Sequence, residues 1–136
     1  MSDIFISYAS EDRPRAQELA QVLERLGWAV WWDRIIPAGK TFAEVIEEDL
    51  ANTRCIIVLW SRVSIAKGWV REEADVGKKR NILFPVLIDQ VDPPIGFRLI
   101  QAADLIEWDG TVTAPVFAKL VKDISYIYRK PPNVYP

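Results

Sequence analysis

The sequence predicts an α/β fold of the flavodoxin-like kind, with three layers: a five-stranded parallel sheet and helices on both of its faces. Apolar segments of strand length alternate along the chain with amphipathic segments of helical spacing, an order that gives parallel strands joined by right-handed crossovers. One segment, Cys55–Trp60, is apolar at every position, as expected of a central strand covered on both faces. No internal repeat is present, so residues 1–128 are assigned to one domain and residues 129–136 to a proline-rich tail or linker.

Five apolar segments are expected to form the strands. They are residues 4–8, 28–32, 55–60, 82–88 and 105–106. Pro85 cannot donate a ladder hydrogen bond, so it indicates a bulge or an edge position in the fourth segment. In the second segment Trp31 and Trp32 alternate, and their side chains should therefore face opposite layers of the fold.

Four segments have the features of amphipathic helices. Asp12 is expected to cap the first, which ends at Gly27, and Thr41 with Glu44 forms a capping-box pair for the second. A third helix is expected from about Trp69 to Lys79. The apolar positions of the first, second and closing helices are Ala16, Leu19, Ala20, Leu23 and Leu26; Phe42, Val45, Ile46 and Leu50; and Phe117, Leu120, Val121, Ile124 and Ile127. Residues 33–40 and 92–94 are predicted loops, and residues 95–103 a short helix or an irregular crossover.

Composition excludes several classes of function. The net charge of −2 argues against a general nucleic-acid binder, which would carry a basic surface. Histidine is absent, which excludes Ser-His-Asp and Cys-His catalysis and leaves no expected zinc site. Cys55 is the only cysteine, so no intramolecular disulfide can form, and it is interpreted as a small buried hydrophobe. No membrane-spanning run or signal-peptide pattern is seen, which predicts a cytoplasmic protein without a membrane partner.

The motifs of two common α/β classes are missing. A phospho-receiver domain needs acids after its first strand and an aspartate at the end of its third, where this chain has Ser7-Tyr8 and Trp60-Ser61. Neither GxxxxGK[ST] nor GxGxxG occurs, so the usual phosphate-binding loops are absent as well.

Trp69 and Glu73 stand four residues apart just beyond the central strand. In a helix they project from one face, one turn apart, near the carboxyl end of a buried strand, where open α/β sheets bind their ligands. A flat aromatic ring beside a carboxylate suits a nucleotide with a cationic ring. The alternative is a core tryptophan next to a solvated glutamate.

Four motifs in order make the chain similar to the Toll/interleukin-1 receptor (TIR) domain family, from about Asp3 to Ile127. They are the first-strand box Asp3–Tyr8 followed by Glu11 and Asp12; Gly27–Asp33 followed by a loop with Pro37, Ala38, Gly39 and Lys40; Cys55–Ser61 followed by Trp69–Glu73; and Phe84-Pro85-Val86. Each motif alone is weak, whereas four in the right order are a strong signal.

The resemblance implies a bacterial-type member that cleaves NAD+ into nicotinamide and ADP-ribose or a cyclic isomer, with Glu73 rather than its neighbour Glu72 as the catalytic residue. This chemistry fits a site without histidine, because nicotinamide leaves as a neutral molecule and needs no general acid. A single carboxylate facing the oxocarbenium ion supplies the main electrostatic stabilisation. NAD+ is then the substrate, and neither a cofactor nor a metal is implied.

The residues expected to border this pocket lie at strand ends and in the second loop. They are Ser7, Tyr8, Ala9, Trp32, Asp33, Gly39, Lys40, Ser61 and Trp69. Trp69 either stacks on the substrate or packs under its helix. The segment Ile36–Lys40 corresponds to the BB loop of the family, which implies self-association with other TIR domains and activation through it. Two alternatives remain: a non-catalytic interaction module and a domain that binds NAD+ without cleaving it.

Overall fold

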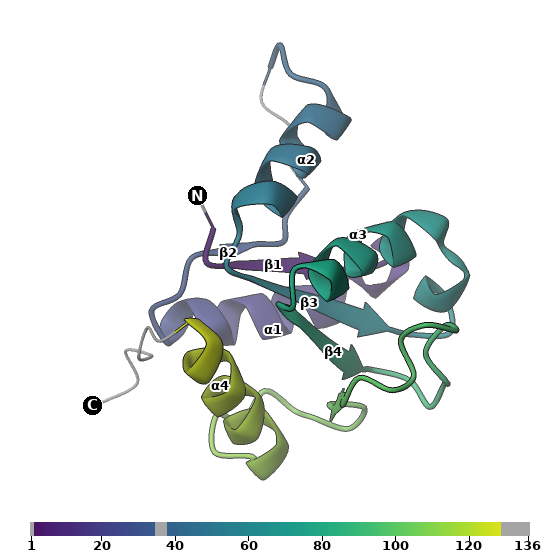
Figure 1. Ribbon diagram of the computed structural model, residues 1–136. Helices are drawn as coiled ribbons and strands as arrows, with labels where there is room; N and C mark the ends of the chain where they lie inside the picture. Colours follow the sequence, from purple (N-terminus) through teal and green to yellow (C-terminus); the bar gives the residue numbers. More distant parts are fainter. Residues whose placement is uncertain (1, 35–37, 129–136) are drawn as a thin grey trace.

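The computed structural model describes residues 2–34 and 38–128 (Figure 1). Within them, five parallel strands form one sheet in the order β2-β1-β3-β4-β5. The strands are β1 (Ile4–Ser7), β2 (Val30–Trp31), β3 (Cys55–Trp60), β4 (Leu83–Leu87) and β5 (Ala103–Asp104). This order, with helices on both faces of the sheet, is the flavodoxin-like arrangement, so the predicted fold class is confirmed.

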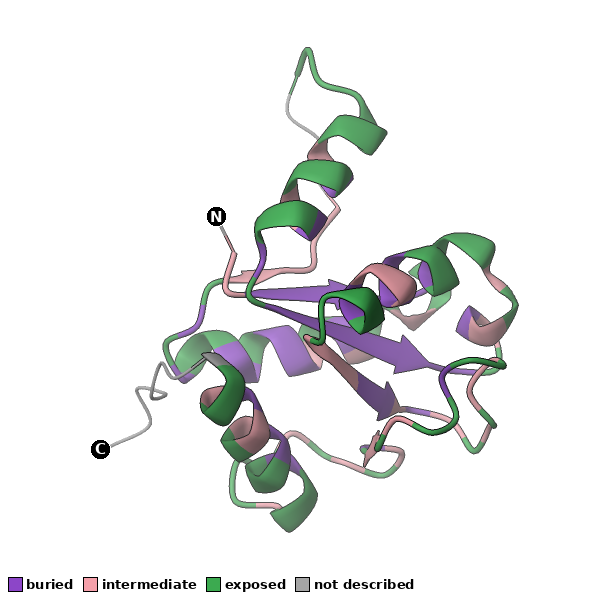
Figure 2. Ribbon diagram, viewed as in Figure 1, coloured by how far each residue is buried: buried purple, intermediate pink, exposed green. Residues whose placement is uncertain are grey.

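The helices cover the two faces of the sheet in pairs. They are α1 (Arg13–Arg25), α2 (Phe42–Asn52), α3 (Gly68–Lys79) and α4 (Pro115–Tyr128), with short 3-10 turns η1 (Ser10–Asp12) and η2 (Ser64–Ala66). Helices α1 and α4 pack together on one face, and α2 and α3 pack on the other. Strands β1 and β3 are buried along their whole length between these layers (Figure 2), which places their carboxyl ends next to the start of α3.

The second helix begins as the sequence predicts, but only its carboxyl half packs on the sheet. The Thr41 hydroxyl accepts the N–H of Glu44 at 3.2 Å, and the Glu44 carboxylate accepts the N–H of Thr41 at 3.4 Å, so the capping box is confirmed. Ile46 and Leu50 are buried, whereas Phe42 is 50% exposed, contrary to its predicted place on the apolar face. As the first residue of α2, Phe42 lies beyond the packed part of the helix.

The second strand is shorter than the predicted 28–32 because its first residue still belongs to the turn that ends α1. The N–H of Trp28 donates to the carbonyl of Leu23, and only Val30 and Trp31 pair with β1. The predicted alternation of the two following tryptophans is confirmed. Trp31 stacks on Phe5 at 4.8 Å in the α2–α3 layer, whereas Trp32 packs in the α1–α4 layer.

The last two strands depart from prediction in position. Pro85 lies inside the sheet, in register with Val58, and no bulge accompanies it. Backbone groups along β4 point alternately toward β3 and toward β5, and those of Pro85 point toward β5. Pairing with β5 starts only at Val86, so the missing N–H of Pro85 costs no hydrogen bond of the sheet. Strand β5 precedes the predicted segment, because Leu105 lies in the core beneath α4. Leu105 is apolar because it is buried, and not because it belongs to a strand.

Smaller differences concern the ends of elements. Residues 95–103 form turns leading into β5, so of the two alternatives the irregular crossover is correct. Ile127, predicted on the apolar face of the closing helix, is 47% exposed in its last turn. The tail 129–136 lies outside the described residues. None of the described helices combines the length and apolar character needed to cross a bilayer.

Candidate functional site

The carboxylate of Glu73 is buried at the point where β1 ends beside α3. It is 5% exposed, and its Oε1 accepts a hydrogen bond of 2.6 Å from the hydroxyl of Ser7, the last residue of β1. Its neighbour Glu72 is exposed to solvent. Burial of an ionised carboxylate is costly unless charge and hydrogen bonds compensate it, so Glu73 needs partners at this position.

Arg34 supplies the compensating charge. It lies three residues beyond the end of β2, and its guanidinium donates to both oxygens of Glu73, from Nη1 to Oε2 and from Nη2 to Oε1, each at 3.0 Å. This is the bidentate geometry that makes arginine–carboxylate pairs strong and specific. The two side chains are 12% and 6% exposed, so water screens the pair little.

Four aromatic rings surround the same guanidinium. Its Cζ lies 4.7 Å from the ring centroid of Trp69, 5.1 Å from that of Trp31, 5.3 Å from that of Tyr8 and 5.5 Å from that of Phe5. We call these four rings together with Glu73 the cation cage, since ring faces and carboxylate all attract a positive charge. Trp69 and Glu73 both contact Arg34, so they share one face of α3 as their spacing predicts.

A crevice of about 240 Å³ opens beside the cage. Its lining residues are Tyr8, Ser10, Arg13, Arg34, Phe42 and Trp69. The crevice lies at the carboxyl end of β1, next to the point between β1 and β3 where the strand order reverses, which is where doubly wound sheets bind their ligands. Its volume is below the roughly 300–1,000 Å³ that is usual for ligand pockets.

Burial raises the pKa of two side chains in this region. Burial raises the pKa of Tyr8, partly opposed by the cation Arg34, and its hydroxyl donates to the carbonyl of Trp32 at 2.6 Å. Burial also raises the pKa of Asp12, partly opposed by a hydrogen bond of 2.5 Å from Ser61. Asp12 was predicted to cap the first helix. It occupies the capping position, but its side chain makes no capping bond because it binds Ser61 instead.

The structure brings Ser7, Tyr8 and Trp69 together around Glu73, whereas other predicted site residues have different partners. Ala9 is fully buried. Trp32 lies under the guanidinium of Arg13 at 4.8 Å, and Asp33 pairs with the same guanidinium at 3.1 Å.

Gly39 and Lys40, the predicted site residues of the second loop, show no contact with the cage. Gly39 and Lys40 are exposed, and Lys40 lies 3.7 Å from Glu48 on α2. Ile36 and Pro37 of the predicted BB loop lie outside the described residues. Within the described parts of the chain, no three side chains of types that ligate metals converge.

The residue that contacts Glu73 most extensively is not among the predicted site residues. Arg34 falls in the predicted loop 33–40, and the predicted site also lacks Ser10, Arg13 and Phe42 of the crevice lining. One signal was available: a buried glutamate requires a cation, and Arg34 is the first cation after the tryptophan-rich second strand.

Fold and site together define a class of protein, a flavodoxin-like domain that presents a buried carboxylate from α3 at the reversal of strand order. A family model described as the TIR domain matches residues 4–121, and the chain belongs to the TIR domain family.

Similar proteins include two curated relatives and two solved structures. The chain is 36% identical over 75 residues to a probable 2′ cyclic ADP-D-ribose synthase, TcpB of Brucella abortus (54% of this chain, 30% of the relative). It is 34% identical over 91 residues to the NAD(+) hydrolase TcpA of a Theionarchaea archaeon (62% and 28%). The chain thus matches less than a third of the length of these relatives.

Both solved structures share the fold. The TIR domain of the Toll-related receptor TRR-2 from Hydra magnipapillata superposes with a TM-score of 0.79 at 25% identity, covering 91% of this chain and 98% of that one. The TIR domains of the activated Roq1 resistosome superpose with a TM-score of 0.64 at 17% identity, covering 91% and 99%.

Proposed function

We propose that this TIR domain cleaves the nicotinamide–ribose bond of NAD+, with Glu73 as the catalytic residue. The observation that carries the proposal is a buried carboxylate, oriented by the Ser7 hydroxyl, at the ligand-binding end of the sheet. The names of the two curated relatives, an NAD(+) hydrolase and a cyclic ADP-ribose synthase, support the same substrate.

The reaction requires little acid–base chemistry from the protein. When the bond between ribose C1′ and the pyridinium nitrogen breaks, its electron pair neutralises the ring nitrogen and nicotinamide departs uncharged. The positive charge moves to the ribose as an oxocarbenium ion, which Glu73 stabilises electrostatically. Water then adds at C1′ and releases a proton, giving ADP-ribose; attack by another atom of the ADP-ribosyl group gives a cyclic isomer.

The surrounding residues orient the Glu73 carboxylate and offer ring faces to the substrate. The hydrogen bond from Ser7 fixes the rotamer of Glu73, so the carboxylate needs no reorganisation when charge develops. Trp69 and Tyr8, whose rings line the crevice, offer faces on which a cationic ring can stack.

We further propose that self-association activates the domain. The crevice is smaller than usual ligand pockets, so a second copy could complete it, and Gly39 and Lys40 of the segment that corresponds to the BB loop are exposed. A heterologous contact of this kind assembles into rings or filaments, so activity should rise with protein concentration.

Two matched variants test the catalytic assignment. NAD+ consumption and products are followed by chromatography at high protein concentration and with a crowding agent. Glu73→Gln should lower turnover by about two to three orders of magnitude, the typical cost of losing one preorganised stabilising group. Glu72→Gln removes an exposed carboxylate one residue away and should retain turnover. Wild-type turnover in Glu73→Gln would show that the assignment is wrong.

A second candidate function, a non-catalytic TIR–TIR interaction module, is favoured by one observation. Arg34 already engages both oxygens of Glu73, as a purely structural ion pair would. A wild-type protein that assembles and yet never consumes NAD+ would support this module and exclude the hydrolase.

A further inference from the structure

Arg34 fills the cation cage as a ligand would. Its guanidinium is flat and positively charged, lies within 5.5 Å of four ring centroids and presents two parallel N–H donors to one carboxylate. The Nε of the same side chain is buried without a hydrogen-bond partner among the described residues. A buried polar atom of a structural side chain normally has a hydrogen-bond partner. The cage therefore complements the two Nη atoms and the flat face of the Arg34 guanidinium, but not its Nε.

The proposed substrate offers the same two features in one molecule. A pyridinium ring is a flat, delocalised cation, and the ribose attached to it carries two adjacent hydroxyl donors. Ring faces and a carboxylate recognise both groups by the same interactions that hold a guanidinium.

Arg34 and such a ligand cannot occupy the cage together. Oε1 of Glu73 already accepts two hydrogen bonds, from Ser7 and from Arg34, and Oε2 accepts one from Arg34. A second cation in the same low-dielectric space would also be repelled by the first. In this state the charge of Glu73 is therefore compensated by Arg34 of the same chain.

We propose that Arg34 is an internal competitor that occupies the cation cage in place of the cationic ring of the substrate. The nature of the natural ligand rests on the function proposed above, whereas occupation of the cage by Arg34 does not. Arg34 lies in irregular backbone between β2 and α2, so its side chain can leave the cage without unfolding an element of the sheet.

Binding of a ring cation to the whole chain tests the competition without any turnover. The probe is nicotinamide methylated at its ring nitrogen, a cation without ribose, titrated by calorimetry into wild type and Arg34→Met. If Arg34 occupies the cage in about 90–99% of molecules, its removal tightens the apparent affinity about ten- to a hundredfold. Neutral nicotinamide should gain far less, because it lacks the charge that the cage attracts.

The controls separate competition from a general effect of charge. Arg25→Gln removes an exposed cation of α1 and should bind the probe as wild type does. Glu73→Gln in the Arg34→Met background should lose the gained affinity. If Arg34→Met does not fold, Arg34→Lys keeps the charge without the bidentate fork and should still bind the probe more tightly than wild type. Unchanged or weaker binding in the folded variant would show that Arg34 does not compete.

The two proposals fail in different ways. Tighter probe binding by Arg34→Met with no NAD+ consumption in any variant supports the competition and overturns the hydrolase. NAD+ consumption that depends on Glu73, together with unchanged probe binding in Arg34→Met, supports the hydrolase and overturns the competition.

Discussion

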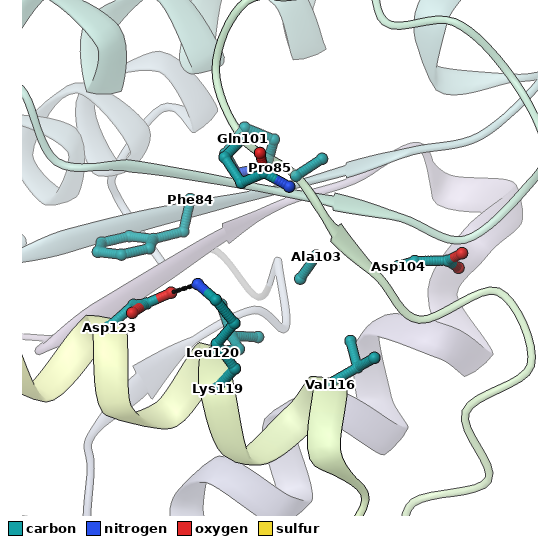
Figure 3. Close-up of a pocket in the computed structure, with 10 residues that line it drawn as sticks. Phe84, Pro85, Gln101, Ala103, Asp104, Val116, Lys119, Leu120 and Asp123 are labelled. Carbon is teal, nitrogen blue, oxygen red and sulfur yellow. Dashed lines mark hydrogen bonds and ion pairs between the residues drawn. The ribbon is translucent and has the colours of Figure 1, made fainter.

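Two hollows of nearly the same size differ in chemistry. The crevice beside the cation cage measures about 240 Å³, and a groove between β4, β5 and α4 measures about 250 Å³ (Figure 3). The groove is lined by apolar residues together with polar and charged ones: Phe84, Pro85, Ala102, Ala103, Val116 and Leu120, and Gln101, Asp104, Lys119 and Asp123. Volume does not distinguish them as candidate sites.

Their ion pairs do. In the groove, Lys119 and Asp123 pair at 2.7 Å one turn apart on α4, with side chains 68% and 47% exposed. At the crevice, the lining residue Arg34 pairs with Glu73 from a separate part of the chain, and the two side chains are 12% and 6% exposed. An exposed pair contributes little and costs little, whereas a buried pair carries a large desolvation cost. Of these two hollows, the crevice is the one that adjoins a costly buried pair, which is why we place function there.

The largest expected difference between the two pairs is in stability. Arg34→Met leaves the Glu73 carboxylate buried without its cation and should lower the unfolding free energy by about 3 kcal/mol, at the lower end for a broken buried pair. Lys119→Met should produce no measurable change, because its pair is solvated. Urea unfolding measures both.

A double variant sharpens this comparison. Glu73→Gln combined with Arg34→Met removes both charges and should recover much of the lost stability, since no buried charge then lacks a partner. Equal losses for Arg34→Met and Lys119→Met would break the distinction between the two hollows.

The next effect concerns affinity. Trp69 lies closest to the guanidinium among the four cage rings and is 36% exposed, so its truncation should change recognition more than folding. Trp69→Ala should weaken binding of the methylated nicotinamide cation to Arg34→Met about tenfold, or about 1–2 kcal/mol, and Trp69→Phe should retain most of the affinity. Val116→Ala, at a similarly exposed position in the groove, should leave binding unchanged. Equal weakening by both alanine variants would contradict the assigned cage.

Local patterns predicted what depends on neighbouring residues. The capping box of α2, the alternation of Trp31 and Trp32 and the shared face of Trp69 and Glu73 all follow from spacing over a few residues. The continuous apolar run of β3 likewise predicted its central position in the sheet. The catalytic role of Glu73 stays a prediction, because a position beside the crevice is not a test of turnover.

Long-range pairing was not predictable in the same way. Arg34 reaches Glu73 across 39 positions, and no periodicity in the sequence selects that arginine from the other cations. Strand β5 was misplaced because Leu105 is apolar as a core residue and not as part of a strand. Phe42 was misplaced because only the carboxyl half of α2, with Ile46 and Leu50, packs on the sheet. Each error arose where tertiary packing overrides a local preference.

The smallest expected effect lies just beyond the end of β3, where Asp12 accepts the hydrogen bond from Ser61. Burial holds the pKa of Asp12 above its usual value of 3.8 in the folded state, partly opposed by that hydrogen bond. A carboxyl with a raised pKa binds its proton more tightly when folded, so its stabilising contribution is present below about pH 3.8 and is lost as pH rises through the raised pKa.

Asp12→Asn removes this titration and keeps an oxygen that accepts from Ser61. Its stability relative to wild type should therefore rise as pH increases from 3 toward 7, and the advantage should disappear at the acid end. Urea unfolding across this range measures the change, and Glu47→Gln, which removes an exposed carboxylate of α2, gives the baseline for losing one negative charge. An advantage that shrinks as pH rises would mean that the folded protein stabilises Asp12 in its charged form, contrary to the effect of burial.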